Sequence, residues 1–168
     1  MSRGILTFDC YGTLVDWETG LLRVLRPWAH RRAVAARDDE LLEAFAAAES
    51  YAETRLPGLK YSNLLGVVQE MIATSFGVES SAADRAELAG SVGLWPVFDD
   101  SRAALAELQR DYRLIVVSNV DRDSFDSSQE SLGIRFGRHR RRRWSVQARP
   151  AHVRADTRGG RFVWLWSR

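Results

Sequence analysis

Two short apolar runs, each ending in polar residues, interrupt a chain whose pattern is otherwise helical. The first covers residues 4–9, ends at Asp9, and is followed by the turn signal Tyr11-Gly12-Thr13. The second covers residues 112–119 and ends in Ser118 and Asn119. Continuous apolar runs are typical of parallel strands that are buried on both faces. Because open α/β sheets place their sites at the carboxyl ends of the strands, we expect these polar residues at one edge.

Between the two runs, residues 18–93 show helical periodicity and no convincing strand. Asp38 or Asp39 is expected to cap one helix, whose apolar stripe includes Leu41, Leu42, Phe45 and Ala46. Ser62 is expected to open a second helix that Gly77 closes, and Ser81 to cap a third. A connector at residues 95–100, a helix at 101–111 and an amphipathic segment ending near Leu132 complete the pattern.

This order of elements predicts an α/β fold with a Rossmann-like parallel sheet and an all-helical cap inserted after the first strand. Residues 1–16 and 95–136 would form the core, which we expect to be incomplete. Residues 17–94 would form the cap, and residues 137–168 an atypical Arg-rich tail.

Composition favours a soluble cytoplasmic protein. The single cysteine, Cys10, excludes an internal disulfide. No apolar run approaches the roughly 20 residues of a membrane helix, and the N-terminus lacks the apolar stretch of a signal peptide. The net charge of +2 conceals a division, because residues 1–136 carry 14 basic and 21 acidic side chains, whereas residues 137–168 carry 10 and one.

The segment from Phe8 to Asp16, FDCYGTLVD, resembles the first motif of the haloacid dehalogenase superfamily. Val116-Val117-Ser118-Asn119 resembles the second, with Ser-Asn typical of the dehalogenase branch. A helical insert of this length between the two motifs also suits the family. The resemblance covers residues 4–136, about four-fifths of the chain, and by itself an Asp before a turn is equally often a capping residue.

The resemblance implies an (S)-2-haloacid dehalogenase-like hydrolase with Asp9 as nucleophile. Asp9 would displace halide from C2 of a short 2-haloalkanoic acid, and water would hydrolyse the resulting ester. Ser118 and Asn119 would contact the substrate or orient Asp9, Thr13 would hold the loop, and the backbone N–H groups of Cys10 and Tyr11 would stabilise negative charge. In the family a cap Arg binds the halide, and Arg31, Arg32 and Arg37 lie in that region.

Tyr11 stands where superfamily phosphatases carry a second Asp. Since magnesium sites usually include carboxylates, this residue implies the metal-independent 2-haloacid dehalogenase branch, and we expect neither metal nor cofactor. A phosphatase of atypical motif, or a non-catalytic protein with a basic nucleic-acid-binding tail, stays an alternative. The expected partner is a small 2-haloacid, not a membrane or nucleic acid, and a homodimer stays open.

The resemblance ends near residue 136. The family requires a third motif with a Lys, and a fourth with Asp, Asn or Ser, but the only Lys here is Lys60, within the expected cap. The Arg-rich text of residues 137–168 has three explanations: a basic arm for nucleic acid, a diverged C-terminal half, or a shifted reading frame. The third is favoured, because codons exist for residues 146–149 that read Ser-Lys-Pro one base later. We therefore expect an impaired, marginally stable and aggregation-prone copy of such an enzyme.

Overall fold

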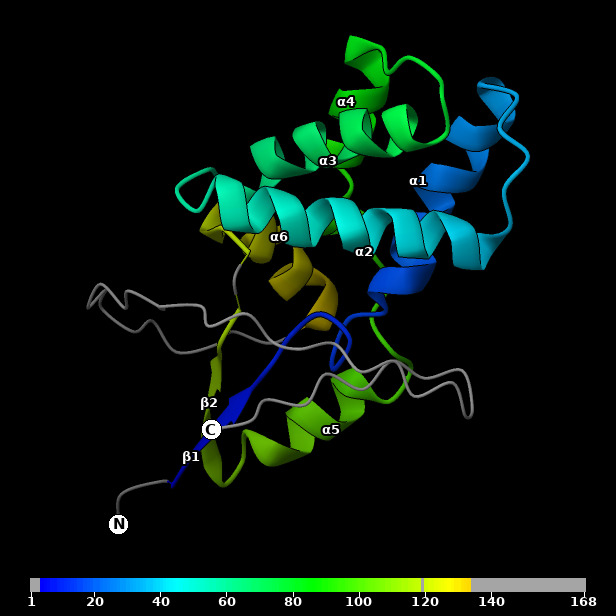
Figure 1. Ribbon diagram of the computed structural model, residues 1–168. Coiled ribbons are helices and arrows are strands. Elements are labelled where there is room, and N and C mark those ends of the chain that lie inside the picture. Colours follow the sequence, from blue (N-terminus) through cyan, green and yellow to red (C-terminus); the bar gives the residue numbers. More distant parts are fainter. Residues whose placement is uncertain (1–3, 119, 134–168) are drawn as a thin grey trace. The chain divides into compact units, whose positions relative to one another are not determined.

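A two-stranded parallel sheet forms the base of the structure. The computed structural model describes residues 4–118 and 120–133. Strand β1 (Gly4–Phe8) pairs with β2 (Tyr112–Val116), with Gly4 opposite Tyr112 and Phe8 opposite Val116. The strands lie side by side and run in the same direction (Figure 1). The predicted α/β class with a parallel sheet is therefore confirmed.

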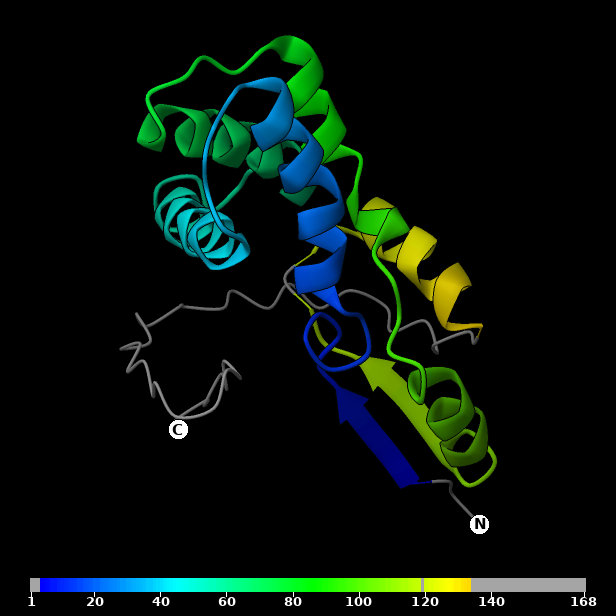
Figure 2. The same cartoon turned by 90° about the vertical axis from the view of Figure 1, so that its right-hand side faces the viewer.

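Four α-helices and one short 3-10 helix follow β1 and fall within residues 17–94, as the helical periodicity of residues 18–93 predicts. They are α1 (Trp17–Arg31), α2 (Asp38–Arg55), α3 (Tyr61–Ser75), α4 (Ala82–Ala89) and η1 (Val92–Leu94). Helix α3 packs between α2 and α4, and α1 contacts both α2 and α4 (Figure 2). We refer to α1–α4 as the helical insertion. Its core consists of large apolar side chains, among them Leu21, Leu25, Trp28, Leu41, Phe45, Leu65 and Ile72.

Two of the predicted helix ends are confirmed. The Ser81 side chain caps α4 by accepting a hydrogen bond from the backbone N–H of Asp84 at 3.1 Å. Helix α3 ends at Ser75, and Gly77, two residues later, adopts a φ of +69°, a conformation that favours glycine. Local side-chain chemistry therefore identified these boundaries correctly.

Two other predicted helix starts are wrong. Helix α2 begins at Asp38 with Arg37 as its N-cap, whose backbone N–H donates to Glu40 at 2.8 Å, while the carboxylate of Asp38 accepts from Arg26. Ser62 does not open α3, which begins one residue earlier. The backbone N–H of Ser62 donates instead to a carboxylate oxygen of Asp121, 3.2 Å away. The Asp38 carboxylate and the Ser62 N–H thus both have partners that are distant in sequence.

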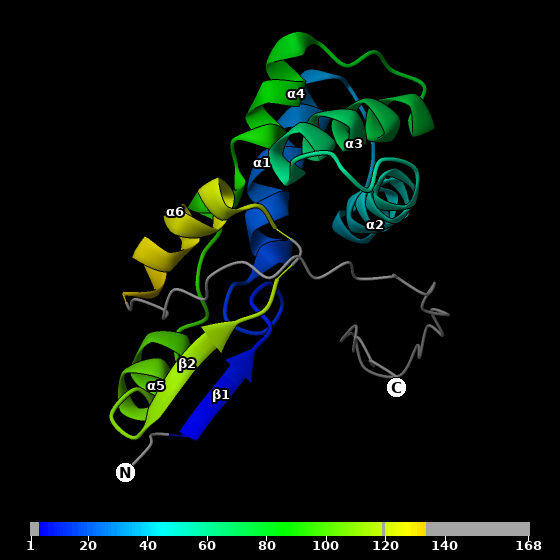
Figure 3. The same ribbon diagram turned by 90° about the vertical axis from the view of Figure 1, so that its left-hand side faces the viewer.

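Two further helices flank β2 in sequence: α5 (Ser101–Leu108) precedes it and α6 (Arg122–Leu132) follows it. Figure 3 shows α5 beside β2. Helix α5 ends three residues before the predicted boundary, since the N–H groups of Arg110 and Asp111 bond three residues back and tighten the turn. The second strand ends at Val116 and not at residue 119.

The expectation that both strands are buried on both faces is wrong for the described residues. Leu114 of β2 and Leu105 of α5 are buried, but Ile5 of β1 is 57% exposed and Tyr112 of β2 is 40% exposed. The physical reason is that helices packed over a sheet bury its faces, and within the described residues each strand has extensive contacts only with the other strand. The apolar composition of these strands fits a buried sheet, but it does not determine how much of each face other elements bury.

Several predictions fall on residues that the structure does not describe. Asn119 and the Arg-rich tail at residues 137–168, with its three explanations, lie outside the described ranges. Among the helices that are described, none combines the length and the apolar character that crossing a bilayer requires.

Candidate active site

Asp9 lies immediately after β1, at the carboxyl edge of the sheet. The strand ladder continues past β2 on the neighbouring side, because the N–H of Val117 donates to the carbonyl of Phe8 at 2.8 Å. The parallel register therefore carries Asp9 and Ser118 to the same edge of adjacent strands, which are about 4.8 Å apart in a sheet. The carboxylate of Asp9 is exposed.

The loop that follows, residues 9–16, is a tight turn and is called the Asp9 loop below. The carbonyl of Cys10 accepts hydrogen bonds from the N–H groups of Leu14, at 2.7 Å, and Val15, at 3.0 Å. Gly12 adopts a φ of +91°, which a side chain would strain. The hydroxyl of Thr13 lies 3.4 Å from the Oδ2 of Asp9 and donates to it. The turn thus holds the carboxylate from one side and leaves it open to solvent on the other.

The Cys10 thiol is unsuited to nucleophilic work in the folded chain. Burial raises its pKa to about 12, and the neighbouring Asp9 carboxylate adds to that increase. The thiolate is the reactive form of cysteine. Cys10 is therefore a buried, neutral filler of the core below the loop.

Tyr11 ties the Asp9 loop to α6 and to the segment before α5. Its hydroxyl lies 3.0 Å from the Oγ of Ser128, a buried residue of α6. Its ring meets that of Trp95 edge to face, with centroids 5.5 Å apart. Burial is the main reason that the pKa of Tyr11 is raised above its usual value. Tyr11 therefore stays a neutral phenol, and in this state it supplies neither a carboxylate nor a phenolate.

Ser118 begins the connection from β2 to α6. Its Oγ accepts a hydrogen bond from the N–H of Val120 at 3.2 Å. Asp121 then caps α6 by accepting from Ser124, and it also accepts from Ser62 of α3. Although partial burial opposes ionisation of Asp121, these two N–H donors lower its pKa. The loop after β2 is therefore fixed at both ends and also bound to the helical insertion.

The structure places other groups near the Asp9 loop that sequence reasoning missed. A Cβ on Gly12 would lie 3.3 Å from the indole nitrogen of Trp17, whose ring contacts Phe45 of α2. Tyr61 of α3 donates to the carboxylate of Glu49 of α2. No motif marks these residues, because α2 is rich in Glu and each of them belongs to an ordinary amphipathic pattern. Only the packing of α2 and α3 identifies them.

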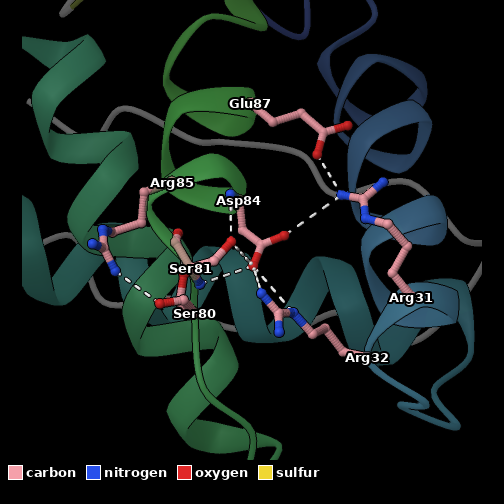
Figure 4. A network of polar contacts seen from close by, with 7 residues as sticks. All are labelled: Arg31, Arg32, Ser80, Ser81, Asp84, Arg85 and Glu87. Carbon is pink, nitrogen blue, oxygen red and sulfur yellow. Dashed lines mark hydrogen bonds and ion pairs between the residues drawn. The ribbon is translucent and has the colours of Figure 1, made fainter.

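The three arginines considered for halide binding are all engaged in ion pairs. Arg32 pairs with the buried carboxylate of Asp84, and Arg31 pairs with both Asp84 and Glu87 (Figure 4). Arg37 pairs with two acids at the start of α2, Asp39 at 3.0 Å and Glu40 at 3.1 Å. Burial disfavours the charge on Asp84, but hydrogen bonds from Ser81 and Arg32 prevail and lower its pKa to about 2. These arginines therefore serve the helical insertion itself.

Comparison with solved structures places this architecture. A defluorinating L-2-haloacid dehalogenase superposes with a TM-score of 0.69 at 18% identity, over 80% of this chain and 58% of that one. The chain has the fold of the haloacid dehalogenase superfamily. An L-2-haloacid dehalogenase from Xanthobacter autotrophicus gives a TM-score of 0.59 at 22% identity, over 79% and 53% of the two chains. A HAD-type hydrolase from Bacillus subtilis, bound to magnesium, gives 0.63 at 14% identity, over 79% and 61%.

The similarity to these structures is limited to the fold. No family model and no curated protein matches the sequence. The chain also spans less than two thirds of the length of the haloacid dehalogenases that it matches. The described haloacid-dehalogenase-like part is therefore a partial core with a helical insertion after the first strand.

Proposed function

We propose that this chain derives from a hydrolase that removes halide from short 2-haloalkanoic acids, with Asp9 as nucleophile. A carboxylate oxygen of Asp9 attacks C2, and the carbon–halogen bond breaks with its electron pair leaving on the halide. The product is an ester between Asp9 and the substrate, with C2 inverted. Water then adds to the carbonyl of Asp9, releases the 2-hydroxy acid and one proton, and restores the carboxylate.

The observation that carries this proposal is the exposed carboxylate of Asp9 at the carboxyl end of β1, in a haloacid dehalogenase fold. A nucleophile needs access to its substrate and a fixed orientation. The hydrogen bond from Thr13 orients the carboxylate, and the turn through Gly12 supports it. Tyr11 occupies the position at which a phosphatase of this superfamily carries its second acid, and its neutral phenol favours the dehalogenase reaction over phosphate transfer.

Ser118 is proposed to bind the substrate carboxylate, together with Asn119. The parallel register brings Ser118 to the edge that carries Asp9, which supports this role. A hydroxyl is a donor that suits an anionic group. The Ser118 hydroxyl accepts one bond from Val120 and has its own proton left to donate.

Turnover by this chain alone is expected to be weak. Among the described residues, no Lys or Arg forms an ion pair with Asp9, and the single Lys, Lys60, pairs with Asp123 at 3.2 Å. A cation beside a carboxylate nucleophile favours its charged form and its orientation. The described residues therefore include the proposed nucleophile, Asp9, but not the basic side chain that the family places beside it.

The proposal is tested by incubating the full chain with L-2-chloropropionate in water labelled with oxygen-18, followed by peptide mass spectrometry. The expected result is slow chloride release with the label in the peptide that contains Asp9, because water attacks the Asp9 carbonyl. The Asp9→Asn variant should lose both signals, and Asp99→Asn, an exposed acid before α5, should keep both. Label found only in the product acid, or chloride release that survives Asp9→Asn, contradicts the mechanism.

A further inference from the structure

One face of helix α2 is directed toward the Asp9 loop. Trp17 connects them, since its indole lies against Gly12 and its ring centroid is 6.1 Å from that of Phe45. Residues four apart on a helix lie on the same face. Glu49 is four residues after Phe45, so it belongs to this face, one turn further along α2.

A second path of contacts connects Glu49 to the Asp9 loop through α3. The hydroxyl of Tyr61, the first residue of α3, donates a hydrogen bond to Oε1 of Glu49. Tyr61 is 9% exposed, and Tyr11 is among the groups that raise its pKa, which indicates that the two phenols lie near each other. Tyr11 is in turn two residues from Asp9. Two series of contacts therefore connect the Glu49 carboxyl group with the Asp9 loop.

The charges around Glu49 are acidic. Glu53, one turn further on the same helix, adds negative charge, and Tyr61 from α3 contributes a neutral phenol that in turn lies near Tyr11. Lys60, the residue before Tyr61, directs its ammonium group to Asp123. Within the described part of the chain, no ion pair joins a basic side chain to Glu49 or Glu53.

We propose that Glu49 is a specificity-determining residue of the Asp9 site, which disfavours a substrate carboxylate when it is ionised and accommodates it when it is protonated. The inference rests on the proposed function and adds a substrate preference to it. In the haloacid dehalogenase family the cap contributes an Arg to the site, whereas this chain presents a Glu and a Tyr. A neutral substrate analogue, such as an amide, is admitted in both protonation states.

The ionisation of Glu49 supports this selection at physiological pH. Burial raises its pKa to about 7, against the opposing effect of the hydrogen bond from Tyr61, and Glu53 raises it further. Glu49 therefore changes charge in a range where the short acids that would be substrates are fully ionised. Below this range the protonated carboxyl group is also a donor for the substrate carboxylate.

Binding of the reaction product and its amide tests the proposal without depending on turnover. The Kd values of D-lactate and D-lactamide for the full chain are measured by NMR titration at about pH 5.5 and about pH 8.5, on either side of the pKa of about 7. The ratio of the D-lactate Kd to the D-lactamide Kd should rise about tenfold between the two, as expected for a nearby like charge at the edge of a protein. In Glu49→Gln the ratio should stay constant, and in Glu43→Gln, an exposed acid of the same helix, it should rise as in the wild type.

Tyr61→Phe provides a readout that a purely structural role does not affect. Because the Tyr61 hydroxyl lowers the pKa of Glu49, its removal should move the midpoint of the rise to higher pH. A ratio independent of pH in the wild type, or one that still rises in Glu49→Gln, overturns this inference and leaves the role of Asp9 intact. Failure of both ligands to bind overturns the proposed function, and this inference with it.

Discussion

The most direct test of the helical insertion is removal of one buried charge, by Asp84→Asn. Asp84 is 5% exposed, accepts hydrogen bonds from the N–H and hydroxyl of Ser81, and pairs with Arg32 and Arg31. An amide of the same size keeps one acceptor but removes the negative charge. The two arginines would then lack their shared partner.

The structure gives a magnitude for this loss. The pKa of Asp84 is lowered from 3.8 to about 2, and each unit corresponds to about 1.4 kcal/mol. The charged form therefore contributes about 2 kcal/mol to folding at neutral pH. Truncating one partner of a fully buried pair costs about 3–5 kcal/mol. The smaller figure applies because Arg32 is 31% exposed and water partly solvates it once the charge is gone.

The assay is urea unfolding of the full chain, followed by far-UV circular dichroism. The control is Glu87→Gln, because Glu87 pairs with Arg31 on the surface, where the two side chains are 41% and 46% exposed, and should change stability by less than about 0.5 kcal/mol. A carboxyl group whose pKa is lowered by folding stabilises the folded state at pH values above its unfolded-state pKa. This stabilisation is lost as the pH falls through the folded-state pKa. The difference between wild type and Asp84→Asn should therefore shrink from about pH 4 toward about pH 2. An Asp84→Asn variant as stable as Glu87→Gln at neutral pH would refute the assignment of Asp84 as the central charge of the insertion.

Two further substitutions test the packing and the ionisation of the insertion. Gly20→Ala should destabilise the fold by about 2 kcal/mol, since a Cβ there would lie 2.3 Å from the Trp95 ring. Gly66→Ala in α3 is the control and should be neutral or stabilising, because a Cβ there has room. The urea midpoints of the two variants measure this difference. For Glu49 the folded pKa of about 7 exceeds the ordinary 4.5, so the folded state retains the proton and stability should fall by up to about 3 kcal/mol as pH rises from about 4.5 to 7. Glu49→Gln should abolish that decline, and an unchanged pH dependence of the urea midpoint would contradict the burial of this carboxyl group.

Particular elements show which features were predictable from sequence. The strand predicted at residues 4–9 is observed at Gly4–Phe8, and Ser81 caps α4 as predicted; both features depend on neighbours within a few residues. The predicted starts of α2 and α3 are wrong: Arg37 is the N-cap of α2 while Asp38 binds Arg26, and Asp121 binds the N–H of Ser62 one residue into α3. These partners are 12 and 59 residues away, and no local pattern signals them.

The candidate site divides in the same way. Asp9, Tyr11 and Thr13 belong to one short motif, so their proximity follows from chain connectivity and turn chemistry, and the sequence alone determined it. The positions of Glu49 and Tyr61 depend on how α2 and α3 pack, and only the tertiary structure decided them. The physical reason is that a turn is fixed by hydrogen bonds between residues close in sequence. The charge and pKa of Glu49 depend instead on which distant side chains exclude water around it.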